Sequence, residues 1–129
     1  MVLTGCNTPE ITFEELFSEP EKYNEKNIII EGFFFHGFES FFLCNELKYY
    51  EENGRYSAIE GPKIWVNSGI SRDIHDGLYQ QDMMGPTEYF GKLSIEGLFE
   101  YGNRYGHLGS HSSQITPSKV ELLPWFAIR

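Results

Sequence analysis

Two stretches of this chain follow one pattern and decide the fold: IEGFFFHG at residues 30–37 and IEGLFEYG at residues 95–102. Each runs isoleucine, glutamate, glycine, an apolar residue and phenylalanine, with a second glycine three positions later. Glycine inside a strand marks a bulge or a sharp bend. Two strands that bend at equivalent places are what closure of a small barrel requires. The repeat therefore predicts that Gly32 and Gly97 lie in one sheet that closes into a barrel.

The strands expected around this repeat are 27–37, 38–47, 63–68, 92–102 and 118–124. In 92–102 the residues Leu93, Ile95, Gly97 and Phe99 alternate with polar ones and should face the core. In 63–68 the same alternation predicts that Trp65 faces outward.

Two helices and a turn are also expected. Thr12 and Glu15 have the spacing of a capping box, and Pro20 should end the helix that they begin. Ser71 can cap a second helix at 71–81. Within the long connection 48–62, Asn53-Gly54 is a hairpin signal.

The expected order is a short N-terminal helix, three strands, a helix and two strands, which gives a mainly β (α+β) fold. It is the order of the OB-fold, a five-stranded and partly open barrel. A chain of 129 residues has the length of one domain. We expect residues 1–10 to form a polar tether and 11–129 to form the OB-like domain.

Charge and hydropathy limit the function. Nineteen acidic against ten basic residues leave a formal charge of −9, and such a surface repels phosphate backbones and anionic lipid. Nucleic-acid binding is therefore not expected from composition. No segment approaches the ~20 apolar residues that span a bilayer.

Leu3-Thr4-Gly5-Cys6 resembles a bacterial lipobox, in which the cysteine carries lipid. A second resemblance, to bacterial OB-fold lipoproteins and related tRNA-anticodon-binding-like domains, is carried by residues 12–35, TFEELFSEPEKYNEKNIIIEGFFF. The YGHLG stretch at 105–109 resembles the same family, whose function is uncharacterised. The resemblance implies lipidation of Cys6 and a place in the cell envelope, outside the cytoplasmic membrane. No charged or apolar leader precedes Cys6 here. If the lipobox is a chance match, the protein is cytoplasmic. A Cys6–Cys44 disulfide is the competing use of Cys6, and Cys44 itself reads as a buried thiol.

The stretch YGNRYGHLGSHSS at 101–113 is expected to be the loop between the last two strands, which in an OB-fold flanks the binding face. A ligand or protein partner would then contact Trp65, Tyr101, Arg104, Tyr105 and His107. The structural alternative is that Tyr105 and Leu108 pack onto the end of the barrel.

Two further classes of function remain as hypotheses. Single-stranded nucleic acid would need stacking aromatic side chains in a positive groove. A metal would be held by His36, His107 and His111, since imidazole binds zinc and copper; we expect no resident metal or other cofactor. Neither a nucleophile elbow nor a zinc-protease motif occurs, so no catalytic residue is assigned. The sequence predicts a non-enzymatic module that binds an unidentified protein or small ligand, joined to a membrane only through Cys6.

Overall fold

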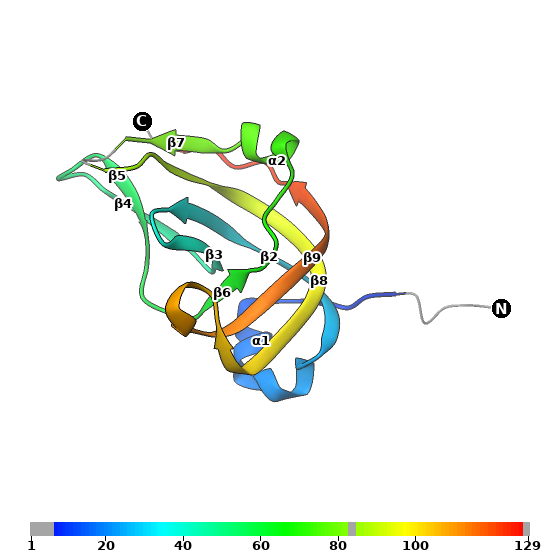
Figure 1. Ribbon diagram of the computed structural model, residues 1–129. Helices are drawn as coiled ribbons and strands as arrows, with labels where there is room; N and C mark the ends of the chain where they lie inside the picture. Colours follow the sequence, from blue (N-terminus) through cyan, green and yellow to red (C-terminus); the bar gives the residue numbers. More distant parts are fainter. Residues whose placement is uncertain (1–6, 83–84, 128–129) are drawn as a thin grey trace.

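The computed structural model describes residues 7–82 and 85–127, and Cys6 lies outside this range. The chain is mainly β, with two short helices (Figure 1). Its elements are β1 Glu10–Ile11, α1 Phe13–Ser18, the 3₁₀ turn η2 Pro20–Tyr23, β2 Lys26–Gly37, β3 Ser40–Cys44, β4 Leu47–Tyr50, β5 Arg55–Ala58, β6 Lys63–Val66, α2 Arg72–Asp76, β7 Tyr79–Gln81, β8 Glu88–Tyr105, the 3₁₀ turn η3 His107–Gly109 and β9 His111–Leu122.

Seven strands form one mixed sheet in the order β1-β2-β3-β6-β9-β8-β7, and β2 also pairs with β8. Strands β2, β3, β6, β9 and β8 thus form a closed hydrogen-bonded ring. Most pairings around the ring are antiparallel. The exception is the parallel pairing of β6 with β9, where Trp65 lies opposite Gln114 and Val66 opposite Ile115.

The two glycines of the repeat lie in neighbouring strands of this sheet, as predicted. Gly32 lies opposite Leu93, and Gly97 lies opposite Ile28. A Cβ at Gly97 would collide with the carbonyl oxygen of Thr116, at a bulge where β8 meets β9. A Cβ at Gly32 would lie 2.7 Å from the Phe13 ring and 2.8 Å from the carbonyl oxygen of Cys44. Both positions therefore need glycine because another part of the chain approaches the backbone closely.

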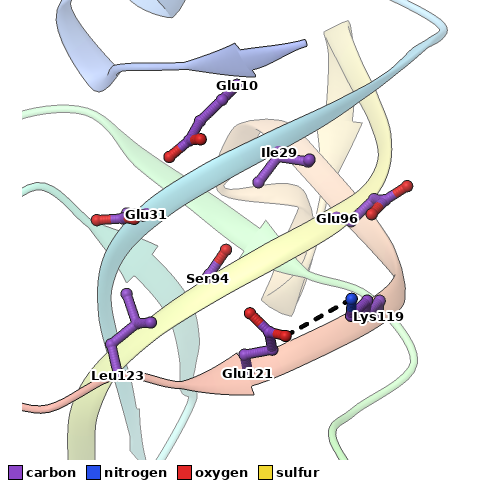
Figure 2. Close-up of a pocket in the computed structure, with 8 residues that line it drawn as sticks. All are labelled: Glu10, Ile29, Glu31, Ser94, Glu96, Lys119, Glu121 and Leu123. Carbon is purple, nitrogen blue, oxygen red and sulfur yellow. Dashed lines mark ion pairs between the residues drawn. The ribbon is translucent and has the colours of Figure 1, made fainter. Parts of the chain in front are cut away.

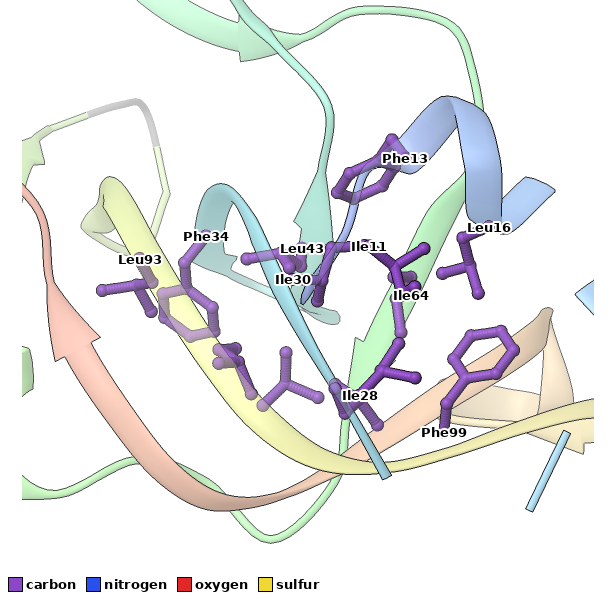
Figure 3. Close-up of a cluster of buried hydrophobic side chains, with 13 residues drawn as sticks. Ile11, Phe13, Leu16, Ile28, Ile30, Phe34, Leu43, Ile64, Leu93 and Phe99 are labelled. Atoms are coloured by element: carbon purple, nitrogen blue, oxygen red, sulfur yellow. The ribbon is translucent and has the colours of Figure 1, made fainter. Parts of the chain in front are cut away.

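The main core fills the ring and is covered by α1. Its buried side chains are Ile11, Phe13, Leu16, Ile28, Ile30, Phe34, Leu43, Ile64, Val66, Leu93, Ile95, Phe99 and Ile115. Figure 3 shows Leu16 of α1 pointing toward Ile64 and Phe99, and the Phe13 ring on the side of Leu43. This set confirms the predicted alternation. Leu93, Ile95 and Phe99 of β8 face the core, as do Ile64 and Val66 of β6, which flank the outward-facing Trp65.

The capping box of α1 is also confirmed. The Glu15 amide donates to Thr12 Oγ1 at 3.1 Å, and the Thr12 amide donates to Glu15 Oε1 at 3.0 Å. The bond from the Thr12 amide, and secondarily one from the Thr12 hydroxyl to the same carboxylate oxygen, lower the pKa of the Glu15 carboxyl. They fix where α1 begins, and so which of its side chains reach the core.

A second cluster lies on the outer face of the ring, with Phe35, Phe42, Cys44, Tyr56 and Phe90 buried in it. The hairpin β4–β5 and the segment around Trp125 cover it. The hairpin expected around Asn53-Gly54 is thus present, as a separate two-stranded sheet packed against the ring. The Gln81 side chain fastens it, because its amide accepts from the Tyr56 N–H at 2.9 Å and donates to the Tyr56 carbonyl at 2.8 Å.

The expected helix at 71–81 is wrong in its second half. Ser71 caps α2, with the Ile74 amide donating to its hydroxyl at 3.4 Å. Gly77 ends the helix, and Tyr79 then pairs with Phe90 as part of β7. Tyr79 packs against the aromatic side chains of the outer cluster. These contacts outweigh the helical spacing of apolar residues in this part of the sequence. Neither α1 nor α2 is long enough to span a bilayer, and the same holds for every other helix in the described residues.

The expected strand boundaries also need correction. The segment 38–47 holds the end of a turn, β3 and the first residue of β4 rather than one strand. The expected loop 101–113 is mostly strand, since β8 continues to Tyr105 and β9 begins at His111. Only residues 106–110 make the turn between them.

We predict that Gly97→Ala destabilises the fold by about 3 kcal/mol, because backbone rather than a flexible side chain blocks the new methyl group. Gly85→Ala is the matched control, since a Cβ at Gly85 meets nothing within 4 Å, and it should change the free energy of unfolding by less than about 0.5 kcal/mol. Urea unfolding of both variants measures the difference. Equal stability of the two would contradict the close approach at Gly97.

Candidate functional site

Two hairpin turns from different parts of the chain meet at one end of the ring. The turn between β2 and β3 carries Phe38 and Glu39, and the turn between β8 and β9 comprises residues 106–110. His107 Nε2 lies 3.5 Å from Glu39 Oε2, so an ion pair joins the two turns when the imidazole is protonated. We call Phe38, Glu39 and residues 106–110 the rim. Its β8–β9 turn is the orange loop at the lower left of Figure 1.

The rim exposes two large apolar side chains. Phe38 is 69% exposed and Leu108 is 87% exposed. Leu108 has φ of +53° and Glu39 has φ of +62°, and this left-handed conformation is uncommon for residues with a Cβ. Leu108 therefore adopts an unfavourable backbone conformation without burying its side chain. The alternative in which Leu108 packs onto the end of the ring is wrong.

Trp65 lies beneath the rim, on the outer face of β6. A Cβ at Gly106 would lie 2.6 Å from the Trp65 ring, so the backbone of the β8–β9 turn packs directly on the indole. The ring centroid of Trp65 lies 5.3 Å from that of His111 and 6.2 Å from that of Phe41. Trp65 is half-buried and supports the turn that carries His107 and Leu108.

Lys63 and the buried Phe42 lie beside these rings. The Lys63 ammonium lies 5.6 Å from the centroid of the Phe42 ring, and the His111 ring lies 6.1 Å from Phe42. We call Phe42, Trp65 and His111 the floor of the site. Burial, and secondarily the charge of Lys63, lower the pKa of His111.

The structure brings together only part of the predicted ligand-contacting set. Trp65 and His107 share the site described above. The Arg104 side chain runs along the β8–β9 turn, where a Cβ at Gly109 would lie 3.3 Å from Arg104 Cβ. Tyr101 packs against the main core instead, and its amide donates to Asn24 Oδ1 at 2.8 Å.

Tyr105, the remaining member of the predicted set, is half-buried at the end of β8. Its pKa is raised by burial and by the carboxylates of Glu100 and Glu25. The phenol thus lies in a negative environment and stays protonated at neutral pH.

The three histidines named as metal candidates have different neighbours. His36 packs against Phe41 at 4.7 Å between ring centroids, His107 pairs with Glu39, and His111 lies beside Trp65. Within residues 7–82 and 85–127, no group of three or more His, Cys, Asp and Glu is arranged to hold a metal ion.

The fourth histidine lies close to the first. The His75 ring of α2 is 5.6 Å from His36 and 4.4 Å from Tyr89. His36 Nδ1 is buried without a hydrogen-bond partner in the described part of the chain. Burial, and secondarily the charge of His75, lower the pKa of His36. His36 is therefore neutral at pH 7 and belongs to the packing of the ring end.

A hollow of about 240 Å³ on another face of the sheet is lined by carboxylates (Figure 2). Glu10, Glu31, Glu96 and Glu121 line it, and Lys119 lies 3.5 Å from Glu121. It is an open acidic surface. Its β8 residues, Ser94 and Glu96, lie in the middle of that strand, whereas the rim follows the strand's end. It would attract cations, but each of the four glutamates is at least partly exposed, so their carboxylates are solvated surface charges.

Cys44 is a buried thiol, as predicted. It is 1% exposed, and its Sγ lies 3.5 Å from the carbonyl oxygen of Glu46, to which it donates. Burial raises the pKa of Cys44 to about 11. The thiol is therefore a poor nucleophile and a structural group.

Sequence reasoning missed Phe38, Glu39 and Phe42 because it read 38–47 as one strand, and it did not single out Lys63 at the start of 63–68. The available signal was an apolar residue directly after Gly37, between two apolar runs, where a turn would expose it. Comparisons of the chain with protein-family models, with curated proteins and with solved structures find no match. The site is therefore interpreted from its own geometry.

We predict that the stability of the fold falls as the pH drops below about 6.5, the usual pKa of histidine. The pKa values of His36 and His111 are lowered in the folded state, so the unfolded chain binds more protons in this range, which favours unfolding. The contribution is fully present above about pH 6.5 and is lost toward the folded-state pKa values.

Urea unfolding at about pH 7.5 and about pH 5.5, on either side of the usual histidine pKa, measures this loss, and NMR titration of the imidazole signals assigns it. The variant carrying His36→Gln and His111→Gln should lose less stability between these pH values. Titration of both imidazoles at or above about 6.5 would contradict the burial described here.

Proposed function

We propose that this protein is a non-enzymatic OB-like binding module that recognises another protein through its rim. One observation carries this proposal. Two turns that are distant in sequence are held together by Glu39 and His107, and each exposes a large apolar side chain next to that pair. Such paired exposure is costly in water unless a partner covers it.

The strand connections support the OB-like assignment. The five ring strands follow the chain in the order β2, β3, β6, β8 and β9, and α2 lies between the third and fourth. The third and fifth pair with each other, and the first pairs with the fourth. In an OB-fold the loops after the first and fourth strands flank the binding face. Those loops are the two turns of the rim.

The energetics favour a protein partner. Full burial of a Phe or Leu side chain contributes about 1.5–3 kcal/mol, so Phe38 and Leu108 together could anchor an interface. Aromatic and apolar anchors surrounded by polar groups are typical of binding hot spots. Glu39, His107 and Ser110 supply such polar groups around them.

We also propose that Cys6 carries a lipid anchor and that the protein lies in the bacterial cell envelope. The dark blue N-terminal segment approaches the ring from the side away from the orange turn (Figure 1). Thr8 there donates to Glu96 at 3.1 Å, in the middle of β8 and well before the rim's second turn. An anchor on this side would leave the rim facing away from the membrane.

Intact-mass spectrometry of the protein from its native cells tests the anchor. A diacylglycerol adduct on Cys6, removed by Cys6→Ser, is expected. An unmodified Cys6 in the cytoplasmic fraction would contradict the anchor but leave the rim proposal standing.

Photo-crosslinking tests the binding function. Benzoylphenylalanine placed at position 38 or 108 in the producing cells should form an adduct with the same partner protein. Placed at position 126 it should not, although Phe126 is 86% exposed and thus as accessible as the rim positions. The adduct should also disappear from position 38 when Leu108 is replaced by serine.

Equal crosslinking from positions 38, 108 and 126 would show only non-specific hydrophobic association and would contradict a defined binding site. The competing function is single-stranded nucleic-acid binding, which the aromatic floor and Lys63 favour. Crosslinks to nucleic acid instead of protein from position 108 would replace our proposal by that one.

A further inference from the structure

We infer that the segment bound at the rim is an acidic peptide, in which a large apolar side chain lies next to aspartate or glutamate. This inference rests on the proposed function, and it names the chemistry of the partner. Phe38 and Leu108 account for the apolar part of the preference. The acidic part follows from the charges around the floor.

Two permanent cations border the site without acidic partners. Lys63 lies over Phe42, and Arg104 runs along the β8–β9 turn. Neither is within ion-pair distance of a carboxylate in the described residues. An arginine fork and a lysine ammonium are the side chains that bind carboxylates most strongly.

Two carboxylates on the elements that carry the site already have partners of their own. Glu39 pairs with His107, which joins the two turns. Glu100 accepts from the Gln114 amide at 2.8 Å. Lys63 and Arg104 therefore remain available to a carboxylate that a partner brings.

These two cations without ion-pair partners contrast with the chain as a whole, whose formal charge is −9. Carboxylates gather instead in the hollow of Figure 2, around Glu31 and Glu96. An acidic partner would be repelled by most of the surface and attracted by the region of Lys63 and Arg104. The charge distribution thus orients the partner as well as binding it.

A peptide fits this surface better than a nucleic acid. Leu108 has no aromatic face on which a base could stack, yet it is the most exposed large apolar side chain in the described residues. Two cations are few for a backbone that carries one negative charge per nucleotide, on a protein that is itself strongly negative. An apolar side chain with one or two adjacent carboxylates matches both features.

Selection from a random peptide library displayed on phage tests the inference with defined probes. Against the full chain, we expect enrichment of peptides that combine Phe, Trp or Leu with neighbouring Asp or Glu. A labelled enriched peptide should bind about tenfold more weakly to the variant with Lys63→Glu and Arg104→Glu. The matched control, Lys26→Glu with Arg72→Glu, makes the same change in net charge at exposed positions outside the rim and should bind like the original chain.

The outcomes separate the inference from the function on which it rests. If peptides need Phe38 and Leu108 but show no acidic preference, and the Lys63 and Arg104 changes leave binding intact, the acidic inference is wrong and the rim function stands. If no enriched peptide loses binding with Phe38→Ser and Leu108→Ser, both fail. Displacement of the peptide by a single-stranded oligothymidine of about 20 nucleotides, longer than the site of one OB-fold, would also overturn the inference, in favour of nucleic acid.

Melting curves establish that each variant is folded. Lys63→Gln with Arg104→Gln serves as a second, milder pair. It should weaken peptide binding less than charge reversal does, because it removes attraction without adding repulsion. Equal binding by the glutamine and glutamate pairs would overturn a charge-based preference.

Discussion

The fold depends on the close approach of β8 to β9 at Gly97. At this position the backbone of β9 lies too close to β8 to leave room for a side chain. The register between the two strands also shifts by one residue there. Ser118 is the extra residue of the bulge, and its hydroxyl donates to the Glu96 carbonyl at 3.1 Å. This bond satisfies a backbone group at the bulge, where regular pairing is interrupted.

The bend at Gly97 has consequences at both ends of β8. Strand β8 pairs with β2 along one edge and with β9 along the other, so its curvature determines how far the sheet coils. The coil brings β9 against β6, where the parallel pairing closes the ring. Closure then places the turn after β8 next to the turn after β2. The ion pair between Glu39 and His107 is thus a product of the ring, and the rim exists only because the ring closes.

The ring could be predicted from the sequence, but the ends of its strands could not. Gly32 and Gly97 could be identified because a glycine within an apolar strand indicates a bend or a close backbone approach, and the Thr12 cap because it is a local hydrogen-bond pattern. The extent of β8 was missed because Gly102 and Gly106, both with positive φ, look like loop residues although the hairpin continues past the first of them. The β-strand character of Tyr79 comes from contacts with Phe90 and Trp125, which no local pattern reveals.

The same difference between local patterns and long-range contacts holds for the candidate site. Trp65 was assigned to the outer face from alternation alone, and His107 from its position in a Gly-rich turn. Their partners Gly106 and Glu39 depend on which turns the ring brings together, so they could not be assigned before its closure was known. Tyr101 was grouped with them because it is near in sequence, yet strand alternation places its side chain on the core side.

Closure of the ring between β6 and β9 is the claim that a single measurement tests most directly. Nuclear Overhauser contacts between the backbones of these strands should connect Trp65 with Gln114 and Val66 with Ile115, since these pairs lie opposite each other. The Asn67 amide, which donates to the Ile115 carbonyl at 2.8 Å, should exchange slowly with solvent. Absence of these contacts together with fast exchange at Asn67 would show an open sheet, and neither the rim nor the binding function proposed for it would survive that result.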